Sequence, residues 1–182
     1  MPRAIIVLAD GFEELEAVAC IDLLRRSPVE VCIAGLDSLT ITGSHEIRLE
    51  ADMLLENHTP GFDALILPGG MPGTKNLAHS TPLKEVIIKA DHEKKLLAAI
   101  CAAPTVLYSA GVLKNKKATC YPGFEKQFSE TIFVEKPVVR DEHIITSRGA
   151  GTAIPFSLEI IKYICGSEHS EKIASSILYE QS

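Results

Sequence analysis

Residues 96–105 read LLAAICAAPT and hold the clearest indication of the fold in this chain. The apolar run at 96–100 is typical of a strand that is buried on both faces of a sheet. Pro104 fits the start of a helix, because a residue in the first helical turn needs no N–H partner. The stretch therefore predicts a buried strand, a sharp corner at Cys101, and a helix from Pro104 to Ser109.

The alternation of strand and helix extends from this stretch towards both ends of the chain. We expect further strands at 3–9, 29–34 and 63–67, and short strand-like pieces at 118–120, 132–134, 138–139 and 144–146. Helices are expected at 13–26, 82–93, 153–164 and 170–178, with Thr152 as the cap of the third. The irregular segment 36–61 has room for a hairpin outside the main sheet. This order of elements predicts an α/β sandwich with a mostly parallel sheet and helices on both faces.

Length and composition narrow the class of protein further. The 182 residues, 46% of them hydrophobic, fit a single domain over 1–182. A net charge of −6 argues against a dedicated nucleic-acid surface or an anionic membrane as the main partner. There is no apolar run long enough to span a bilayer, and no signal-peptide pattern. Five cysteines without a CxxC pair fit a reducing cytoplasm and predict neither a disulfide framework nor a metal site.

Cys101 occupies the predicted corner between strand and helix. In such sheets, ligands bind beyond the carboxyl ends of the strands, so segments 10–16, 68–73, 101–104 and 147–152 should converge. A cysteine at a corner of this kind faces the first N–H groups of the next helix, which we expect to lower the pKa of its thiol. The alternative is a buried core cysteine, which is how we interpret the other four: Cys20, Cys32, Cys120 and Cys165.

Glu16 differs from the other acids at the start of the first helix. Glu13 and Glu14 complement the helix dipole, as acids at a helix start often do. Glu16, in contrast, shares an apolar helical face with Cys20 and Leu23. Burial there would raise the pKa of its carboxyl, and the neutral acid could donate a hydrogen bond to a thiolate. A solvated glutamate, or a face that contacts another subunit, remains an alternative.

Glycine turns and histidines complete the candidate site. Residues 67–73, LPGGMPG, can bring backbone N–H groups close to a ligand and form an oxyanion hole beside the cysteine corner. The glycines at 149 and 151 lack the third glycine of a dinucleotide fingerprint, so we expect no nucleotide cofactor. No histidine falls at a predicted strand end, which disfavours a Cys–His hydrolase. His45 stays open, because the irregular segment could cover a site.

Four motifs carry a family resemblance, in order along the chain: ADGFEELE at 9–16, LPGG at 67–70, AAICAAP at 98–104 and TSRGAGT at 146–152. Together they resemble the ThiJ/PfpI superfamily, and within it the branch of the parkinsonism-associated protein deglycase and bacterial YajL. The resemblance covers essentially the whole chain. It implies a flavodoxin-like three-layer sandwich, a homodimer, and Cys101 hydrogen-bonded to a protonated Glu16. It also implies that the backbone N–H groups of Gly70 and Ala102 surround the sulfur or an oxyanion.

The resemblance also implies a set of activities. They are glutathione-independent conversion of methylglyoxal to lactate, removal of early aldehyde adducts from proteins and nucleotides, and protection against oxidative stress with chaperone behaviour. Our first hypothesis is therefore a cysteine-dependent enzyme, without a cofactor, that acts on reactive α-oxoaldehydes or on their protein and nucleotide adducts. The alternative is a redox-sensing chaperone in which Cys101 is oxidised to a sulfinate and turns over little substrate.

The chain departs from the family pattern at several positions. Tyr121 stands before a proline where the human-like branch has a histidine, and His45 stands where an arginine is expected. Arg26 and Arg148 match family arginines near the dimer contact and the site, although a helix-end cation and a surface charge would explain them equally well. Tyr121, Arg148 and His45 are therefore accessory candidates. Proton transfer would depend on Glu16, Tyr121 or water.

Overall fold

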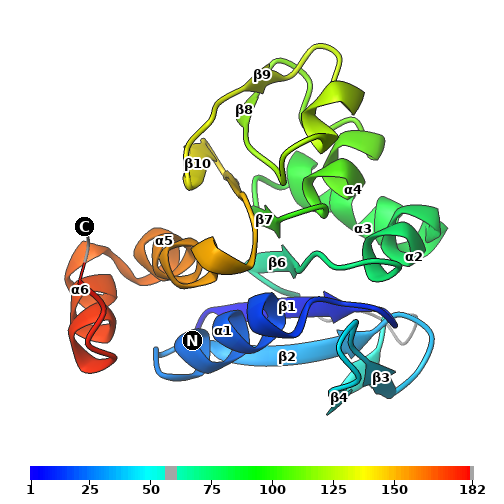
Figure 1. Cartoon of the computed structure of the whole chain (residues 1–182). Helices are drawn as coiled ribbons and strands as arrows, with labels where there is room; N and C mark the ends of the chain where they lie inside the picture. Colours follow the sequence, from blue (N-terminus) through cyan, green and yellow to red (C-terminus); the bar gives the residue numbers. More distant parts are fainter. Residues whose placement is uncertain (56–60, 181–182) are drawn as a thin grey trace.

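The computed structural model describes residues 1–55 and 61–180. Its centre is a seven-stranded sheet with the strand order β10-β11-β7-β6-β1-β2-β5 (Figure 1). The strands are β1 (Arg3–Leu8), β2 (Glu30–Gly35), β5 (Met53–Leu54), β6 (Ala64–Leu67), β7 (Leu96–Ile100), β10 (Val138–Asp141) and β11 (Ile144–Ser147). Neighbouring strands are parallel, except for the antiparallel pair β10 and β11. The mostly parallel sheet expected from the sequence is confirmed.

Helices cover both faces of the sheet and make the fold a three-layer sandwich. On one face lie α1 (Glu14–Arg25), α5 (Ala153–Cys165) and α6 (Ser167–Ser176), and on the other α2 (Gly73–His79), α3 (Thr81–His92) and α4 (Pro104–Ser109) (Figure 1). Two separate clusters of buried apolar residues fill the spaces between the layers. In β1, Ile6 and Leu8 enter one cluster while Ile5 and Val7 enter the other, because successive side chains of a strand point to opposite faces. This is why β1 is apolar from Ala4 to Leu8.

Smaller elements lie outside the main sheet. Segment 36–61 contains the expected hairpin, in which β3 (Thr40–Thr42) pairs with β4 (Arg48–Glu50). Residues 56–60 of that segment lie outside the described part of the chain. A second small sheet pairs β8 (Lys117–Ala118) with β9 (Ile132–Phe133). Two 3₁₀ turns, η1 (Phe124–Gln127) and η2 (Ala150–Thr152), complete the elements. Among the described residues, no helix has the length and apolarity needed to cross a bilayer.

Three local expectations need correction. The predicted glycine turn at 67–73 gives way at its last residue, Gly73, to helix α2, an element that the sequence did not predict. The last helix begins at Ser167 rather than at residue 170, directly after Gly166, whose φ of 91° ends α5. Thr152 does sit at the start of α5, but its hydroxyl does not cap that helix. It bonds instead to the backbone N–H and carbonyl of Gly149, at 3.1 and 2.8 Å.

Candidate active site

Cys101 lies at the corner between β7 and α4 with a φ of 65°. Residues other than glycine rarely adopt such positive φ values, and they persist only where surrounding structure holds them. The Cys101 N–H donates to the carbonyl oxygen of Ser147 at 3.0 Å, and the Cys101 carbonyl accepts from the N–H of Tyr121 at 2.8 Å. Two neighbouring segments therefore hold the backbone in the sharp turn that the sequence predicts. The cysteine is half-buried at this turn.

Glu16 reaches the same place from α1. Its side chain is fully buried, and its Oε2 accepts the Gly69 N–H at 2.7 Å. Its other oxygen, Oε1, takes part in no hydrogen bond of standard distance and angle among residues 1–55 and 61–180. Gly69 leaves the space for this approach, because a Cβ at that position would lie 2.6 Å from Cys101 Cβ and 2.9 Å from Glu16 Oε2. The close contact of the turn, the acid and the cysteine therefore requires glycine at position 69.

The environment changes the proton affinities of both groups. Burial raises the pKa of the Glu16 carboxyl to about 7, against the opposing effects of the Gly69 N–H and the Cys101 thiol. Burial, and then the charge and hydrogen bonding of Glu16, raise the pKa of the Cys101 thiol to about 12, whereas the N–H groups of Ala102 and Gly70 lower it. The raised pKa expected for Glu16 is present. The lowered pKa expected for Cys101 is wrong in direction, because burial of the thiol has the largest effect and raises its pKa, and the repulsion between a thiolate and an ionised Glu16 carboxylate raises it further.

The two groups consequently titrate as one unit. When the pair holds a single proton, that proton lies either on the sulfur, beside a carboxylate, or on Glu16, beside a thiolate. In the second arrangement the carboxylate charge that opposes the Cys101 thiolate is gone, and the carboxyl O–H can donate to the sulfur. A reactive thiolate thus requires Glu16 to hold the proton, and the backbone N–H groups of Gly70 and Ala102 favour that arrangement.

The three accessory candidates lie at different places around the pair. Tyr121 is joined to the corner through its backbone, and its half-exposed ring packs over Gly149. Arg148 follows β11, and its guanidinium forms an ion pair with Glu135 at 2.7 Å. The exposed ring of His45 lies 2.9 Å from a carboxylate oxygen of Glu14. The structure therefore places Tyr121 at the corner, while Arg148 and His45 bind to neighbouring carboxylates.

In the part of the chain that the structure describes, three side chains bring together carboxylate oxygens and an imidazole nitrogen, which are common ligand atoms for metal ions. The ligand atoms of Glu13, Glu14 and His45 all lie within 4.8 Å of one another. The buried Glu14 carboxylate accepts hydrogen bonds from the backbone and ring of His45 and from the Ser44 hydroxyl. Burial raises the pKa of Glu14, but the hydrogen bonds from His45, with one from the backbone of Ile47, outweigh it and bring the pKa to about 2. These bonds fasten the β3–β4 hairpin to α1, a link that the sequence spacing of about thirty residues did not reveal.

A mostly parallel α/β sandwich, with a cysteine on a strained strand-to-helix corner and a buried carboxyl beside it, defines a class of α/β proteins with a cysteine at a nucleophile-elbow position. Within this class, the chain belongs to the DJ-1/PfpI family, whose family model matches residues 2–163.

Individual relatives agree with this assignment. Protein DJ-1 homolog B of Arabidopsis thaliana is 37% identical over 180 residues; the match covers 97% of this chain but only 41% of that longer protein. A protein of Pyrococcus abyssi (strain GE5 / Orsay) that is named a deglycase is 32% identical over 165 residues, covering 89% of this chain and 99% of the relative. The crystal structure of Drosophila melanogaster DJ-1beta matches with a TM-score of 0.96 and 35% identity over 99% of each chain. The flavodoxin-like sandwich is confirmed.

Proposed function

We propose that this protein is a cysteine-dependent enzyme that acts, without glutathione, on reactive α-oxoaldehydes or on their early adducts with proteins and nucleotides. The observation that carries the proposal is the pairing of Cys101, at a strained corner, with the buried Glu16 and its raised pKa. A buried acid that holds its proton near neutral pH can exchange that proton with a reacting carbonyl. The deglycase name of the Pyrococcus abyssi relative agrees with this substrate class.

The chemistry follows from the two arrangements of the shared proton. The Cys101 thiolate adds to the aldehyde carbon of methylglyoxal, and the new alkoxide takes the Glu16 proton to give a hemithioacetal. The Glu16 carboxylate then removes the hydrogen of that carbon, and a proton returned to the neighbouring carbon leaves a thioester of lactate. Water cleaves the thioester, releasing lactate and the thiol. The N–H groups of Gly70 and Ala102, which lower the pKa of the Cys101 thiol, are suited to stabilise the negative oxygen or sulfur in these steps.

Lactate formation from methylglyoxal tests the proposal. The wild-type protein should produce lactate, Cys101→Ser should produce none above buffer, and Glu16→Gln should be slower by about a hundredfold, the range for loss of a general acid–base. Cys165→Ser is the matched control, because this half-buried cysteine lies at the end of α5 and should leave the rate unchanged. A wild-type protein that is no faster than buffer would overturn the proposal.

A second candidate function is redox sensing with chaperone behaviour. It is favoured by the position of Cys101, which is more accessible than the buried Cys20, Cys32 and Cys120. Two equivalents of hydrogen peroxide would convert its thiolate to a sulfinate and release two waters. Mass spectrometry after mild peroxide treatment would support this function if two oxygens are gained on Cys101 alone. Oxidation spread over all five cysteines would reject it.

We also propose that the protein acts as a homodimer in the cytoplasm. An apolar groove of about 620 Å³ runs along α1 beside the β3–β4 hairpin and the start of α5. Exposed apolar side chains line it: Leu15, Val18, Ile47 and Ile154. Such a contiguous stripe suits self-association through a second copy of the chain. Light scattering should give twice the chain mass for the wild type and the chain mass for Leu15→Asp; a monomeric wild type would refute the dimer.

A further inference from the structure

The proposed reaction does not use the cluster of Glu13, Glu14 and His45. Glu13 directly precedes α1, Glu14 is the first residue of that helix, and His45 lies in the turn between β3 and β4. One ligand atom from each side chain lies within 4.8 Å of the other two. Two carboxylate oxygens and an imidazole nitrogen together are a ligand set that zinc accepts in proteins. The cluster contains no cysteine, which is why the cysteine spacing in the sequence gave no sign of it.

The separations between these atoms are those of a tetrahedral zinc site. Zinc bonds of about 2.0–2.2 Å to nitrogen and oxygen, at tetrahedral angles, place neighbouring ligand atoms roughly 3.3–3.6 Å apart. The Nδ1 atom of His45 lies 3.7 Å from Glu13 Oε2 and 2.9 Å from Glu14 Oε2. The Ser44 hydroxyl oxygen lies 3.4 Å from the same Glu13 atom, 3.2 Å from Glu14 Oε2 and 3.1 Å from the imidazole nitrogen. The hydroxyl therefore stands at the fourth corner of the cluster.

Glu14 is held with one carboxylate oxygen facing this cluster. Its side chain is buried, and its Oε1 accepts the backbone N–H groups of His45 and Ile47 at 2.6 and 3.4 Å. These bonds leave Oε2 directed at the imidazole and at the Ser44 hydroxyl. Gly43 permits the close approach, because a Cβ there would lie 2.2 Å from Glu14 Oε1. With a pKa of about 2, the carboxyl is ionised at neutral pH, as a metal ligand must be.

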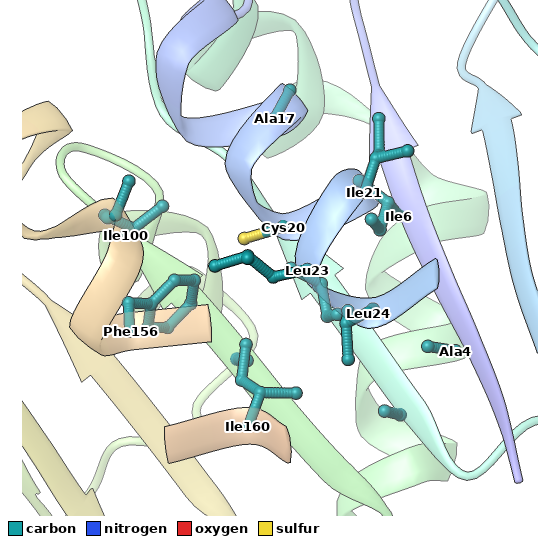
Figure 2. Packing of buried hydrophobic residues seen from close by; sticks show 14 of the residues in the cluster. Ala4, Ile6, Ala17, Cys20, Ile21, Leu23, Leu24, Ile100, Phe156 and Ile160 are labelled. Carbon is teal, nitrogen blue, oxygen red and sulfur yellow. The ribbon is translucent and has the colours of Figure 1, made fainter. Parts of the chain in front are cut away.

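The two elements that carry the ligands are themselves fixed. The buried face of α1 packs into the apolar cluster beneath it through five side chains, Ala17, Cys20, Ile21, Leu23 and Leu24 (Figure 2). The hairpin is bonded to the loop before α1 by its backbone. The Gly11 N–H donates to the Thr42 carbonyl oxygen at 2.8 Å, and the Ser44 N–H donates to the Phe12 carbonyl oxygen at 2.8 Å. The ligand atoms are therefore placed by the fold and need little rearrangement to hold an ion.

We propose that Glu13, Glu14 and His45 bind a zinc ion, with the Ser44 hydroxyl beside the fourth position. Zinc takes the place of the hydrogen between His45 Nδ1 and Glu14 Oε2, and that hydrogen leaves as a proton, so the neutral imidazole is the ligand. The ion joins α1 to the β3–β4 hairpin and offsets the charge of two neighbouring carboxylates. The imidazole ligand favours zinc over calcium or magnesium, which prefer oxygen ligands.

The test is a calorimetric titration of metal-free protein with zinc chloride, run in a Cys101→Ser background. That substitution removes the thiol of the Cys101–Glu16 pair as a competing zinc ligand. One zinc ion per chain should bind. His45→Gln should weaken the binding at least about a hundredfold, the upper end of the cost of losing a group that only supports a ligand. The His45 ring is exposed, so its replacement leaves the core intact. Glu46→Gln is the matched control, because it removes an exposed charge from the same hairpin without removing a ligand, and should leave the affinity unchanged.

Cobalt(II), used in place of zinc, identifies the ligands directly. It should give the visible absorption of a tetrahedral ion without the near-ultraviolet charge-transfer band of a thiolate ligand, and His45→Gln should abolish that absorption. A thiolate band, an absence of zinc binding, half a zinc ion per chain, or an affinity that His45→Gln leaves unchanged would overturn the inference. The readouts do not involve lactate formation, so a failure here is distinguishable from a failure of the proposed enzymatic function.

Discussion

The backbone N–H of Gly69 donates to Glu16 Oε2 at 2.7 Å, and this bond joins the turn after β6 to the buried face of α1. It fixes the carboxyl beside Cys101, because Gly69 lies in contact range of both side chains. The proton pair therefore depends on the backbone of a third segment as well as on its two titratable residues.

Gly69→Ala should separate the pair. The added methyl group would lie 2.6 Å from Cys101 Cβ and 2.9 Å from Glu16 Oε2, so one of them must move. We expect lactate formation to fall at least about tenfold and the free energy of unfolding to fall by roughly 1–3 kcal/mol, as for overpacking of a core. Gly61→Ala is the control, because a Cβ there meets no atom of the described residues within 4 Å. An unchanged rate in Gly69→Ala would show that this close approach is not needed.

Glu16→Gln should change how stability depends on pH. The pKa of Glu16 is raised in the folded protein to about 7 from 4.5, so its contribution is fully present below pH 4.5 and is lost as the pH rises to about 7. The neutral amide does not titrate and is not subject to this loss. Relative to wild type, the free energy of unfolding of the variant should therefore increase across that window by up to roughly 3 kcal/mol. Chemical denaturation at pH 4.5 and pH 8 measures the gain. A constant difference between the two proteins would contradict the burial of a titrating acid.

Glu14→Gln should have the opposite pH signature. The pKa of Glu14 is lowered to about 2 from 4.5, so its contribution is present above pH 4.5 and is lost as the pH falls to about 2. The variant should melt at a lower temperature than wild type at pH 7, and the gap should close as the pH approaches 2. Protease cleavage within the β3–β4 hairpin should also become faster, because Glu14 holds that hairpin to α1. Equal melting temperatures at pH 7 would show that these bonds contribute no net stability.

Tyr121→Phe removes the tyrosine hydroxyl and keeps the rest of the residue, so it measures the contribution of the hydroxyl alone. The bond that Tyr121 makes to the corner comes from its backbone, and its ring packs edge-on against Phe124 with centroids 6.4 Å apart. Both features survive the substitution, so we expect the lactate rate to stay within about twofold of wild type. A rate lower by about a hundredfold would assign general acid–base catalysis to the hydroxyl and remove that role from Glu16.

The sequence predicted the features that depend on local pattern. The corner at Cys101 followed from an apolar run and a well-placed proline, and helical spacing placed Glu16 on an apolar face, where burial was one of the alternatives. It could not show relationships between distant segments. The link of Glu14 to His45 and the contact of Cys20 with Ser157 join residues with no common pattern. The direction of the thiol pKa shift was wrong for the same reason, since the helix N–H groups are local in sequence, whereas the burial of the thiol and the Glu16 charge depend on distant segments.

The most direct test of the central claim is the pH profile of Cys101 alkylation in wild type and Glu16→Gln. If the two residues share a proton, the wild-type rate should rise through a step near pH 7, where Glu16 titrates, and reach a plateau before the thiol itself titrates. Glu16→Gln should lose that step, because the amide has no proton to exchange. Identical profiles in the two proteins would contradict the account.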